Sequence, residues 1–563
     1  MNDPNGAMYD PVKDEYHLFY QWHPNHVQWG NISWGHAVSK NLVTWTDVAH
    51  RGTPSWHGAN ALALSPTGVG TYNGLGIFSG TAQPVGINGA KDGILIVFYT
   101  SVSVLPVPHA PDGETQSIAI SKDGGRTWKD YEGNPVIKSC PEGWDITGFR
   151  DPFVEPWPEM DQVLQQQEPH YYMTVGGGIK DVGPRVMFYA APASNLTKWT
   201  FLGSLWELKA GDSAGPNICN WGNNLEMPNF FSLLDQDGHT HYYLGTGAND
   251  DMRSIWNEGS VYKREDGSVA FQPISGGYSD YGNLYGLTSF NDTKHNHRRV
   301  QWGWSLEDFP ADYASQQGYQ GSLAVPRELF ALVTKNLLDP DRKLRESGAF
   351  ITQLADGTYQ ASVLGVKPLQ DVIQGLREGA SHTNFGNVVG CFFTILSTKG
   401  SLHFELSASF SSGSLGGFVV ATSPGKEEYT SVYFNPDTHE ITVDRTHSTT
   451  LSNFNNSPVR GHFLPYTTTG GIEDISLRVF LDGSLLEVYV NDRFALTTRI
   501  YPDRYDSTGF GLFTAEEKSV NFHNVQSWVG TLNAWPDRPE DTSSLLIVDA
   551  HEQTNHGVWW TGK

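Results

Sequence analysis

The chain has 563 residues, more than one hydrophobic core usually supports, so we expect two or more domains. Its formal net charge of −24 argues against a nucleic-acid backbone or an anionic membrane as a partner, whereas a neutral sugar would be indifferent to it. The 60 glycines and the aromatic content of 12% favour a β architecture.

The first six residues, Met1-Asn2-Asp3-Pro4-Asn5-Gly6, place an acid between two asparagines. Pro4 biases Asp3 toward an extended conformation, and Gly6 permits the sharp turn that must follow. We therefore expect the Asp3 carboxylate to be held rigidly at a strand end. Taken alone, the motif is also compatible with an ordinary surface turn.

A short aromatic strand is predicted over Tyr16–Trp22, and a loose repeat follows it. Trp45, Trp128 and Trp199 each come after a polar turn, at spacings of 83 and 71 residues. Such a repeat is typical of successive blades of a β-propeller, and units of this length fit about five times into about 345 residues. Ordinary core aromatics are the alternative explanation.

Two further acids, Asp151 and Glu226, end apolar segments and are each followed closely by a proline. Retaining glycosidases need one carboxylate as nucleophile and one carboxyl as acid/base, about 5 Å apart, so we expect the three acids to be held on separate rigid strand ends. The inner strands of a propeller surround one funnel, so acids 148 and 75 residues apart in the chain can meet there. The sequence pattern alone does not show that they converge.

The character of the chain changes after about residue 345. Residues 346–380 are predicted to form a linker, with a helix over Val366–Arg377 because apolar residues recur there at helical spacing. From about Val388 the apolar and polar residues alternate as in half-buried strands, with turns between them. We predict a catalytic domain over 1–345 and a C-terminal β-sandwich over 381–563.

The acid motifs and several other segments, in this order, resemble glycoside hydrolase family 32, the invertases, inulinases and fructosyltransferases that act on β-fructofuranosides. The other segments are Phe19–Asn25, Trp29–Ala37, Phe78–Ala82 and Val325–Leu329. The resemblance runs nearly end to end and implies a five-bladed β-propeller followed by a β-sandwich. It also implies a sucrose or fructan substrate. No cofactor is expected, because no phosphate-binding glycine-rich loop precedes a predicted helix.

By this resemblance Asp3 is the nucleophile, Asp151 binds fructosyl hydroxyls and stabilises the transition state, and Glu226 is the general acid/base. The residues expected to line the pocket for one furanose ring are Asn2, Gln21, Trp29, Phe78, Ser79 and Arg150, with Trp304 as a further candidate. Arg150 also keeps a neighbouring carboxylate ionised.

One departure from the family pattern affects the expected activity. The family usually has Trp-Glu-Cys-Pro around the acid/base, and this chain has Leu225-Glu226-Met227-Pro228. From this difference we expect a reshaped wall near the leaving-group site. We therefore predict retaining hydrolysis of sucrose and related fructosides, with fructosyl transfer to sugar acceptors at high sucrose.

Other functions stay open at this stage. A dedicated sucrose fructosyltransferase or an exo-inulinase would share the motifs. An inverting pentosidase on the same fold would hold its carboxyls about 6.5–9.5 Å apart rather than about 5–5.5 Å. A non-catalytic sugar-binding protein would have no use for an acid/base pair. No metal is expected, because Asp235-Gln236-Asp237-Gly238 lacks the rest of a calcium loop and the three cysteines, Cys140, Cys219 and Cys391, are scattered.

The sequence shows neither a leader peptide nor a membrane span. Relatives carry a segment before the first motif, so we expect residues upstream of Met1. Triplets that permit N-glycosylation occur at Asn31, Asn195 and Asn291, and they fit a secreted protein. Whether two copies associate into a homodimer stays open.

Overall fold

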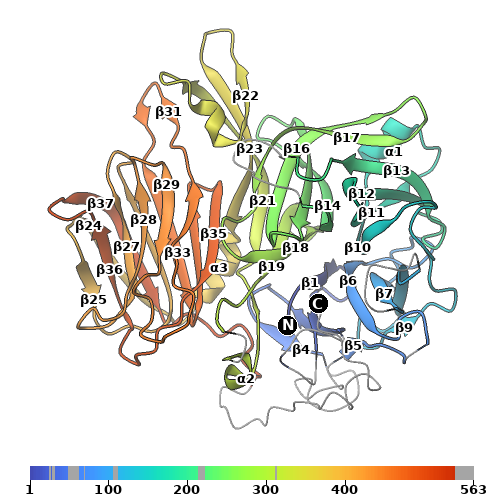
Figure 1. Cartoon of the computed structure of the whole chain (residues 1–563), viewed down its shortest axis with the longest axis horizontal. Coiled ribbons are helices and arrows are strands. Elements are labelled where there is room, and N and C mark those ends of the chain that lie inside the picture. Colours follow the sequence, from blue (N-terminus) through green and yellow to red (C-terminus); the bar gives the residue numbers. More distant parts are fainter. Residues whose placement is uncertain are drawn as a thin grey trace.

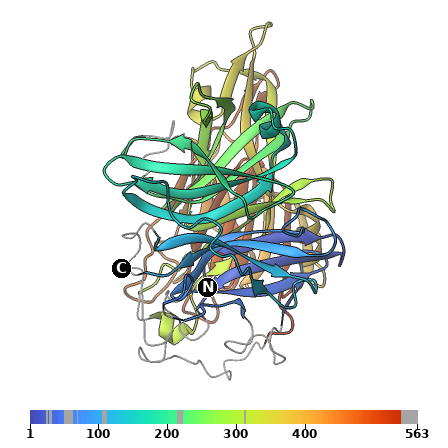
Figure 2. The same ribbon diagram turned by 90° about the vertical axis from the view of Figure 1, so that its right-hand side faces the viewer.

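The computed structural model describes residues 1–23, 27, 32–48, 62–68, 70–104, 112–212, 222–310 and 313–538. Two β-domains lie side by side, with the N-terminal sheets on the right of Figure 1 and the C-terminal sheets on the left. Figure 2 looks at the N-terminal domain, behind which the C-terminal domain lies. Within the described ranges, no helix is both long and apolar enough to cross a membrane.

The N-terminal domain consists of five antiparallel sheets arranged as the blades of a propeller. The strands of the first four blades follow one another along the chain. They are β1 (Pro4–Asp10), β2 (Glu15–Trp22), β3 (Ser33–Ser39), β4 (Trp45–Asp47) and β5 (Leu62–Leu64); β6 (Gly76–Gln83), β7 (Leu95–Val102), β8 (Glu114–Ser121) and β9 (Lys129–Asp130); β10 (Ile146–Pro156), β11 (His170–Ile179), β12 (Gly183–Pro192) and β13 (Thr200–Glu207); and β14 (Leu225–Leu234), β15 (Thr240–Ala248), β16 (Arg253–Lys263) and β17 (Val269–Tyr278). Helix α1 (Pro158–Leu164) joins β10 to β11.

The first strand of each blade faces the centre of the domain. Strands β1, β6, β10, β14 and the first strand of the fifth blade, β18 (Leu284–Asp292), each contact the next, and β18 contacts β1. Because these inner strands form a closed ring, residues from all five blades can share one central site. The predicted five-bladed propeller is confirmed.

The tryptophan repeat marks equivalent positions in the first three blades. Trp45 begins β4, while Trp128 and Trp199 directly precede β9 and β13. Each indole N–H donates to the carbonyl oxygen three residues earlier, at 3.3, 3.1 and 2.9 Å respectively. The three tryptophans therefore secure the same turn before the outermost strand of each blade, and the interpretation as a structural repeat is confirmed.

The fifth blade is larger than the others and includes part of the predicted linker. Its strands are β18, β19 (Arg298–Ser305), β20 (Ser322–Leu323), β21 (Arg327–Leu338), β22 (Phe350–Gln353) and β23 (Tyr359–Pro368), extended by β31 (Thr467–Thr468) and β32 (Gly471–Ile472). Helix α2 (Tyr313–Gln317) and the 3₁₀ helix η2 (Leu344–Ser347) lie in its connections.

The helix predicted over Val366–Arg377 is shorter than expected. Helix α3 spans Gln370–Leu376, and residues 359–368 belong to β23, which pairs with β21 along most of its length. The apolar residues around Val366 therefore belong to a strand that is buried over most of its length, and they pack in a core shared with the fourth blade and the C-terminal domain. Periodicity over so few residues did not separate the end of this strand from the start of the helix.

The C-terminal domain is the predicted β-sandwich of two six-stranded sheets. One sheet contains β24 (Ser381–Gly390), β37 (Val520–Val529), β26 (His403–Phe410), β33 (Ile475–Asp482), β34 (Leu485–Val490) and β35 (Phe494–Arg499), and the other contains β25 (Thr394–Ser397), β36 (Gly509–Thr514), β27 (Gly416–Thr422), β28 (Thr430–Asn435), β29 (Glu440–Asp444) and β30 (Val459–His462). Alternate side chains of both sheets meet in a single apolar core.

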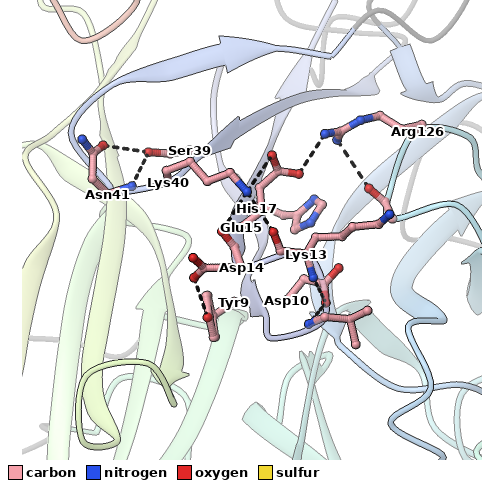
Figure 3. A network of polar contacts seen from close by, with 12 residues as sticks. Tyr9, Asp10, Lys13, Asp14, Glu15, His17, Ser39, Lys40, Asn41 and Arg126 are labelled. Carbon is pink, nitrogen blue, oxygen red and sulfur yellow. Dashed lines mark hydrogen bonds and ion pairs between the residues drawn. The ribbon is translucent and has the colours of Figure 1, made fainter.

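A polar network joins the first two blades at the β1–β2 turn (Figure 3). Arg126 of the second blade donates to Glu15 at 2.9 Å, and Lys40 lies 3.8 Å from the same carboxylate. Lys40 also donates to the carbonyl oxygens of Lys13 and Asp14. Since Asp3 precedes β1 and this turn follows it, the network lies at the opposite end of the strand from Asp3 and has a structural role.

After the sandwich the chain returns to the first blade. The backbone N–H of Trp45 donates to the carbonyl of Ala534 at 2.8 Å, and the Trp45 and Trp535 rings stack with centroids 5.9 Å apart. Arg538 binds Asp47 through two nitrogens, at 2.6 and 2.7 Å. These contacts fasten the C-terminal segment to the blade that carries Asp3.

Candidate active site

The backbone of every inner strand is irregular near the centre of the propeller. Pairing of each inner strand with the second strand of its blade shifts register near the centre: between Asn5 and Met8, Phe78 and Gly80, Arg150 and Phe153, Glu226 and Asn229, and Tyr285 and Thr288. Strand β10 has a second shift, between Ile146 and Gly148. Four residues at these shifts have left-handed backbones: Gly6 (φ 50°), Asp151 (φ 66°), Met227 (φ 48°) and Gly286 (φ 59°). Bulges of this kind re-aim side chains, and strained residues cluster at functional sites.

The three acids do not all lie at strand ends as predicted. Asp3 directly precedes β1 and Glu226 is the second residue of β14, but Asp151 lies inside β10, which begins at Ile146. The bulge between Arg150 and Phe153 turns Asp151 toward the centre without ending the strand. The prediction was wrong for Asp151 because its apolar approach already pairs with β11.

The Asp3 carboxylate is held by a chain of side-chain hydrogen bonds that crosses two blades. The Ser79 hydroxyl donates to Asp3 Oδ2 at 2.6 Å. Gln21 Nε2 donates to Ser79 Oγ at 2.5 Å, and Asn2 Nδ2 donates to Gln21 Oε1 at 2.5 Å. Because each donor is fixed by the next, the orientation of the Asp3 carboxylate is set by both blades.

Strand β18 supplies the surface against which Asp3 packs. A Cβ atom added to Gly286 would lie 2.3 Å from Asp3 Oδ1 and 2.8 Å from Trp304 Nε1. No larger residue fits at Gly286 without displacing the carboxylate. Among the described residues the Trp304 indole N–H has no hydrogen-bond partner, yet it faces Asp3 and favours its ionised form.

Asp151 is buried and is connected to both neighbouring blades. Its backbone N–H donates to the Thr100 hydroxyl at 2.9 Å, and its Oδ2 accepts from the Met227 backbone N–H at 3.1 Å. The second contact uses the backbone of Met227, so it does not depend on that residue's side chain. It places Asp151 directly beside the residue that follows Glu226.

Glu226 lies between a phenol and a guanidinium. Tyr285 donates to Glu226 Oε2 at 2.9 Å, and Arg150 Nε is 3.7 Å from Glu226 Oε1. Tyr285 directly precedes Gly286, which contacts Asp3. The three acids therefore lie close together, near enough for Glu226 to act electrostatically on both Asp3 and Asp151.

Burial and repulsion by neighbouring carboxylates disfavour the ionised forms of Asp3 and Asp151. Burial raises the pKa of Asp3 to about 6, with a further contribution from Glu226, while the Ser79 hydrogen bond opposes the shift. Burial and the charges of Glu226 and Asp3 raise the pKa of Asp151 well above its usual range. Acids with perturbed pKa values in one cluster are typical of a catalytic site.

The structure brings together most of the residues that the sequence suggested. Asn2, Asp3, Gln21, Ser79, Arg150, Asp151, Glu226 and Trp304 belong to the contacts just described. Phe78 is buried, and its carbonyl accepts from the Trp34 indole. Trp29 lies outside the described residues.

The expected role of Leu225 in the pocket wall is wrong. Its side chain is buried in the apolar core shared by the third and fourth blades, because alternate residues of β14 point away from the centre. Leu225 therefore gives no support to fructosyl transfer.

The sequence reasoning missed Glu114, Tyr285 and Gly286. The Leu284-Tyr285-Gly286 segment could have been noticed as a glycine inside an apolar strand, which often marks a bulge or close approach. Glu114 carries no comparable signal. It begins β8 and lies 36 residues before Arg150, with which it pairs at 3.2 Å.

One group among the described residues has the geometry of a cation site, comprising Asp235, Asp237 and His239 on an exposed turn. Its carboxylates already have partners. Asp235 accepts from the backbone N–H groups of Asp237 and His239, and Asp237 pairs with Lys335 at 2.6 Å. The hydrogen bonds of a turn and an ion pair therefore account for these carboxylates.

Comparison with known proteins identifies the relatives of the chain. The model of the glycosyl hydrolases family 32 N-terminal domain matches residues 1–340, and that of the family 32 C-terminal domain matches residues 372–529. A levanase of Bacillus subtilis is 28% identical, with 98% of this chain and 75% of the levanase covered.

Two solved fungal structures are similar over nearly their whole lengths. A fructosyltransferase from A. japonicus is 25% identical with a TM-score of 0.82, covering 95% of this chain and 94% of the fructosyltransferase. A β-fructofuranosidase from Aspergillus kawachii, complexed with glycerol, is also 25% identical, with a TM-score of 0.81 and coverage of 95% and 93%.

Proposed function

Because this chain belongs to glycosyl hydrolase family 32, we propose that it is a retaining β-fructofuranosidase that acts on sucrose and related fructosides. One observation carries the proposal. Asp3, Asp151 and Glu226 come from three blades and lie close together beside the guanidinium of Arg150. A pair of carboxyl groups in this setting is what retaining glycoside cleavage requires.

In the first step Asp3 attacks the anomeric carbon of the fructosyl unit while Glu226 donates a proton to the departing glycosidic oxygen. Ser79 orients the attacking carboxylate through its 2.6 Å hydrogen bond. Asp151 accepts hydrogen bonds from fructosyl hydroxyls, which bind the sugar more tightly as positive charge develops on the ring. The products of this step are free glucose, in the case of sucrose, and a fructosyl ester of Asp3.

In the second step Glu226, now ionised, removes a proton from an incoming acceptor that attacks the ester and regenerates Asp3. Water as acceptor gives hydrolysis, and a sugar hydroxyl gives transfer. The two reactions compete for one intermediate, so transfer increases with sucrose concentration. Transfer is supported by the likeness to the A. japonicus fructosyltransferase, since Leu225 gives it no support.

Product analysis across sucrose concentrations tests this proposal. We expect equal amounts of free fructose and free glucose at low sucrose and less fructose than glucose at high sucrose, with oligosaccharides making up the difference. Equal amounts of the two sugars at every sucrose concentration would rule out fructosyl transfer. Less fructose than glucose even at low sucrose would identify a dedicated fructosyltransferase. Cleavage of inulin in preference to sucrose would identify an exo-inulinase.

Two further properties are part of the proposal. We place the catalytic domain at 1–345, with the outer strands β22 and β23 extending its fifth sheet into the 346–380 segment. We also propose a secreted enzyme, on the basis of the glycosylation triplets, of which that at Asn291 is exposed.

A further inference from the structure

Glu114 is a fourth carboxylate at the site, and the proposed mechanism gives it no role. It is the first residue of β8, the third strand of the second blade, and its side chain is only 1% exposed. Burying a carboxylate is costly unless it is paired. Its position next to the catalytic acids therefore requires a physical reason.

Both oxygens of Glu114 are directed at β10. Oε2 accepts from the backbone N–H of Phe149 at 2.7 Å, and Oε1 lies 3.2 Å from Arg150 Nε. The first contact fixes the carboxylate on the backbone next to Arg150. The second then fixes where the guanidinium lies.

The same nitrogen of Arg150 lies between two carboxylates. Arg150 Nε is 3.2 Å from Glu114 and 3.7 Å from Glu226. The guanidinium packs over Gly148, where an added Cβ would come within 2.8 Å of Arg150 Nη2. Glu114 and the space over Gly148 both hold the guanidinium, so they set its contact with Glu226.

We propose that Glu114 is a positioning residue that holds Arg150 beside Glu226 and shares its positive charge, so that Glu226 can carry the proton it must donate. The inference rests on the proposed function. Without Glu114, Arg150 would be free to form a full ion pair with Glu226, and an ionised Glu226 cannot act as the acid.

The charged and titratable groups that face Glu226 come from four parts of the chain. They are Asp3 before β1, Glu114 on β8, Arg150 and Asp151 on β10, and the Tyr285 phenol on β18. Arg150 is the one cation among them in the described structure. Replacing Glu114 by a neutral residue removes a negative charge that repels ionised Glu226. It also leaves the positive charge of Arg150 without its second partner, so both effects favour the ionised form of Glu226.

The test is the pH dependence of kcat/KM for sucrose in the wild type and in Glu114→Gln. Gln keeps an acceptor for the Phe149 N–H but carries no charge. We expect the alkaline limb, where the acid loses its proton, to move to lower pH by about 1 unit, because a neighbouring opposite charge shifts carboxyl titration by about that much or more. Glu114→Asp, which restores the charge, should return the limb toward its original position.

Glu155→Gln is the matched control. Glu155 is a buried partner of another arginine, Arg299, and lies on the same strand, β10, but takes no part in the site. We expect Glu155→Gln to lose stability while both pH limbs stay in place.

Two results would overturn the inference, and they are distinct. If the wild type releases fructose but Glu114→Gln loses stability or turnover with its alkaline limb unmoved, Glu114 is a structural residue only. If the wild type cleaves neither sucrose nor inulin, the proposed function fails and the positioning role fails with it.

Discussion

Strand β10 carries two buried charge clusters that differ in balance. At Arg150 one guanidinium faces Glu114, Glu226 and Asp151, with Asp3 close by. Five residues along the strand, Glu155 binds Arg299 through both carboxylate oxygens, at 2.9 and 2.7 Å.

The second cluster is a balanced pair of one acid and one cation. Arg299 also donates to Ser289 at 3.0 Å, and its guanidinium lies over the rings of Phe153 and Phe231, 5.5 and 4.9 Å from their centroids. One charge of each sign is largely buried and the two are paired, as in a structural ion pair, although among the described residues Arg299 Nη2 has no hydrogen-bond partner. At Arg150 the acids outnumber the cation, so folding alone does not explain them. The excess of carboxyl groups over cations distinguishes the functional cluster from the structural one.

Removing the reacting acids should give the largest effect. Asp3→Ala and Glu226→Ala are each expected to lower kcat for sucrose by about 10⁴-fold or more, because both groups make or break the fructosyl-enzyme. Asp151→Asn should also be severely impaired. Glu155→Gln, measured in parallel, should keep its turnover wherever it is folded. Retention of most activity by Glu226→Ala would mean that another residue is the acid/base.

The balanced pair should instead dominate stability. Glu155→Gln is expected to destabilise the protein by about 3–5 kcal/mol, because it leaves Arg299 buried without its counter-charge. Denaturant unfolding of the wild type and the variant measures this difference. A loss below about 1 kcal/mol would show that the pair is not structural.

Only part of the cluster around Arg150 could be predicted from the sequence. The family motifs located Asp3, Asp151, Glu226, Ser79 and Arg150, because rigid Pro- and Gly-containing segments have to hold reacting groups in place. Glu114 could not be predicted, since its partner is reached only when β8 of the second blade is packed against β10 of the third.

The two domains could be predicted from the sequence, but the boundary between two of their elements could not. Alternation and the tryptophan repeat indicated blades and a sandwich. The boundary between β23 and α3 depended on pairing with β21, which no local pattern reports.

The sign of the stability change should distinguish Asp3 from Glu155. The pKa of Asp3 is raised from 3.8 to about 6 in the folded protein. The contribution of Asp3 to the free energy of unfolding is therefore fully present below about pH 4 and is lost as the pH rises through 6. Asp3→Asn removes this ionisation and should stabilise the protein by about 1–3 kcal/mol at pH 7. Unfolding at pH 4 and pH 7 tests this, and an equal effect at both values would contradict the raised pKa.

The smallest expected effect concerns the hydrogen bond that orients Asp3. Ser79→Ala should lower kcat/KM by about 10-fold, since a hydrogen bond to a charged group contributes about 1.5–3 kcal/mol. The same bond holds the pKa of Asp3 down, so the acid limb of the pH profile, near pH 6 in the wild type, should move to higher pH. An unmoved limb would show that Ser79 serves substrate binding alone.

Trapping the fructosyl-enzyme tests the central claim most directly. Glu226→Gln, incubated with β-fructofuranosyl fluoride, has a leaving group that needs no proton but lacks the base for the second step, so the intermediate should accumulate. We predict that peptide mass spectrometry after acid quench finds one fructosyl unit esterified to Asp3. Release of fluoride without an adduct, or an adduct on another residue, would contradict the assignment of Asp3 as the nucleophile of a retaining enzyme.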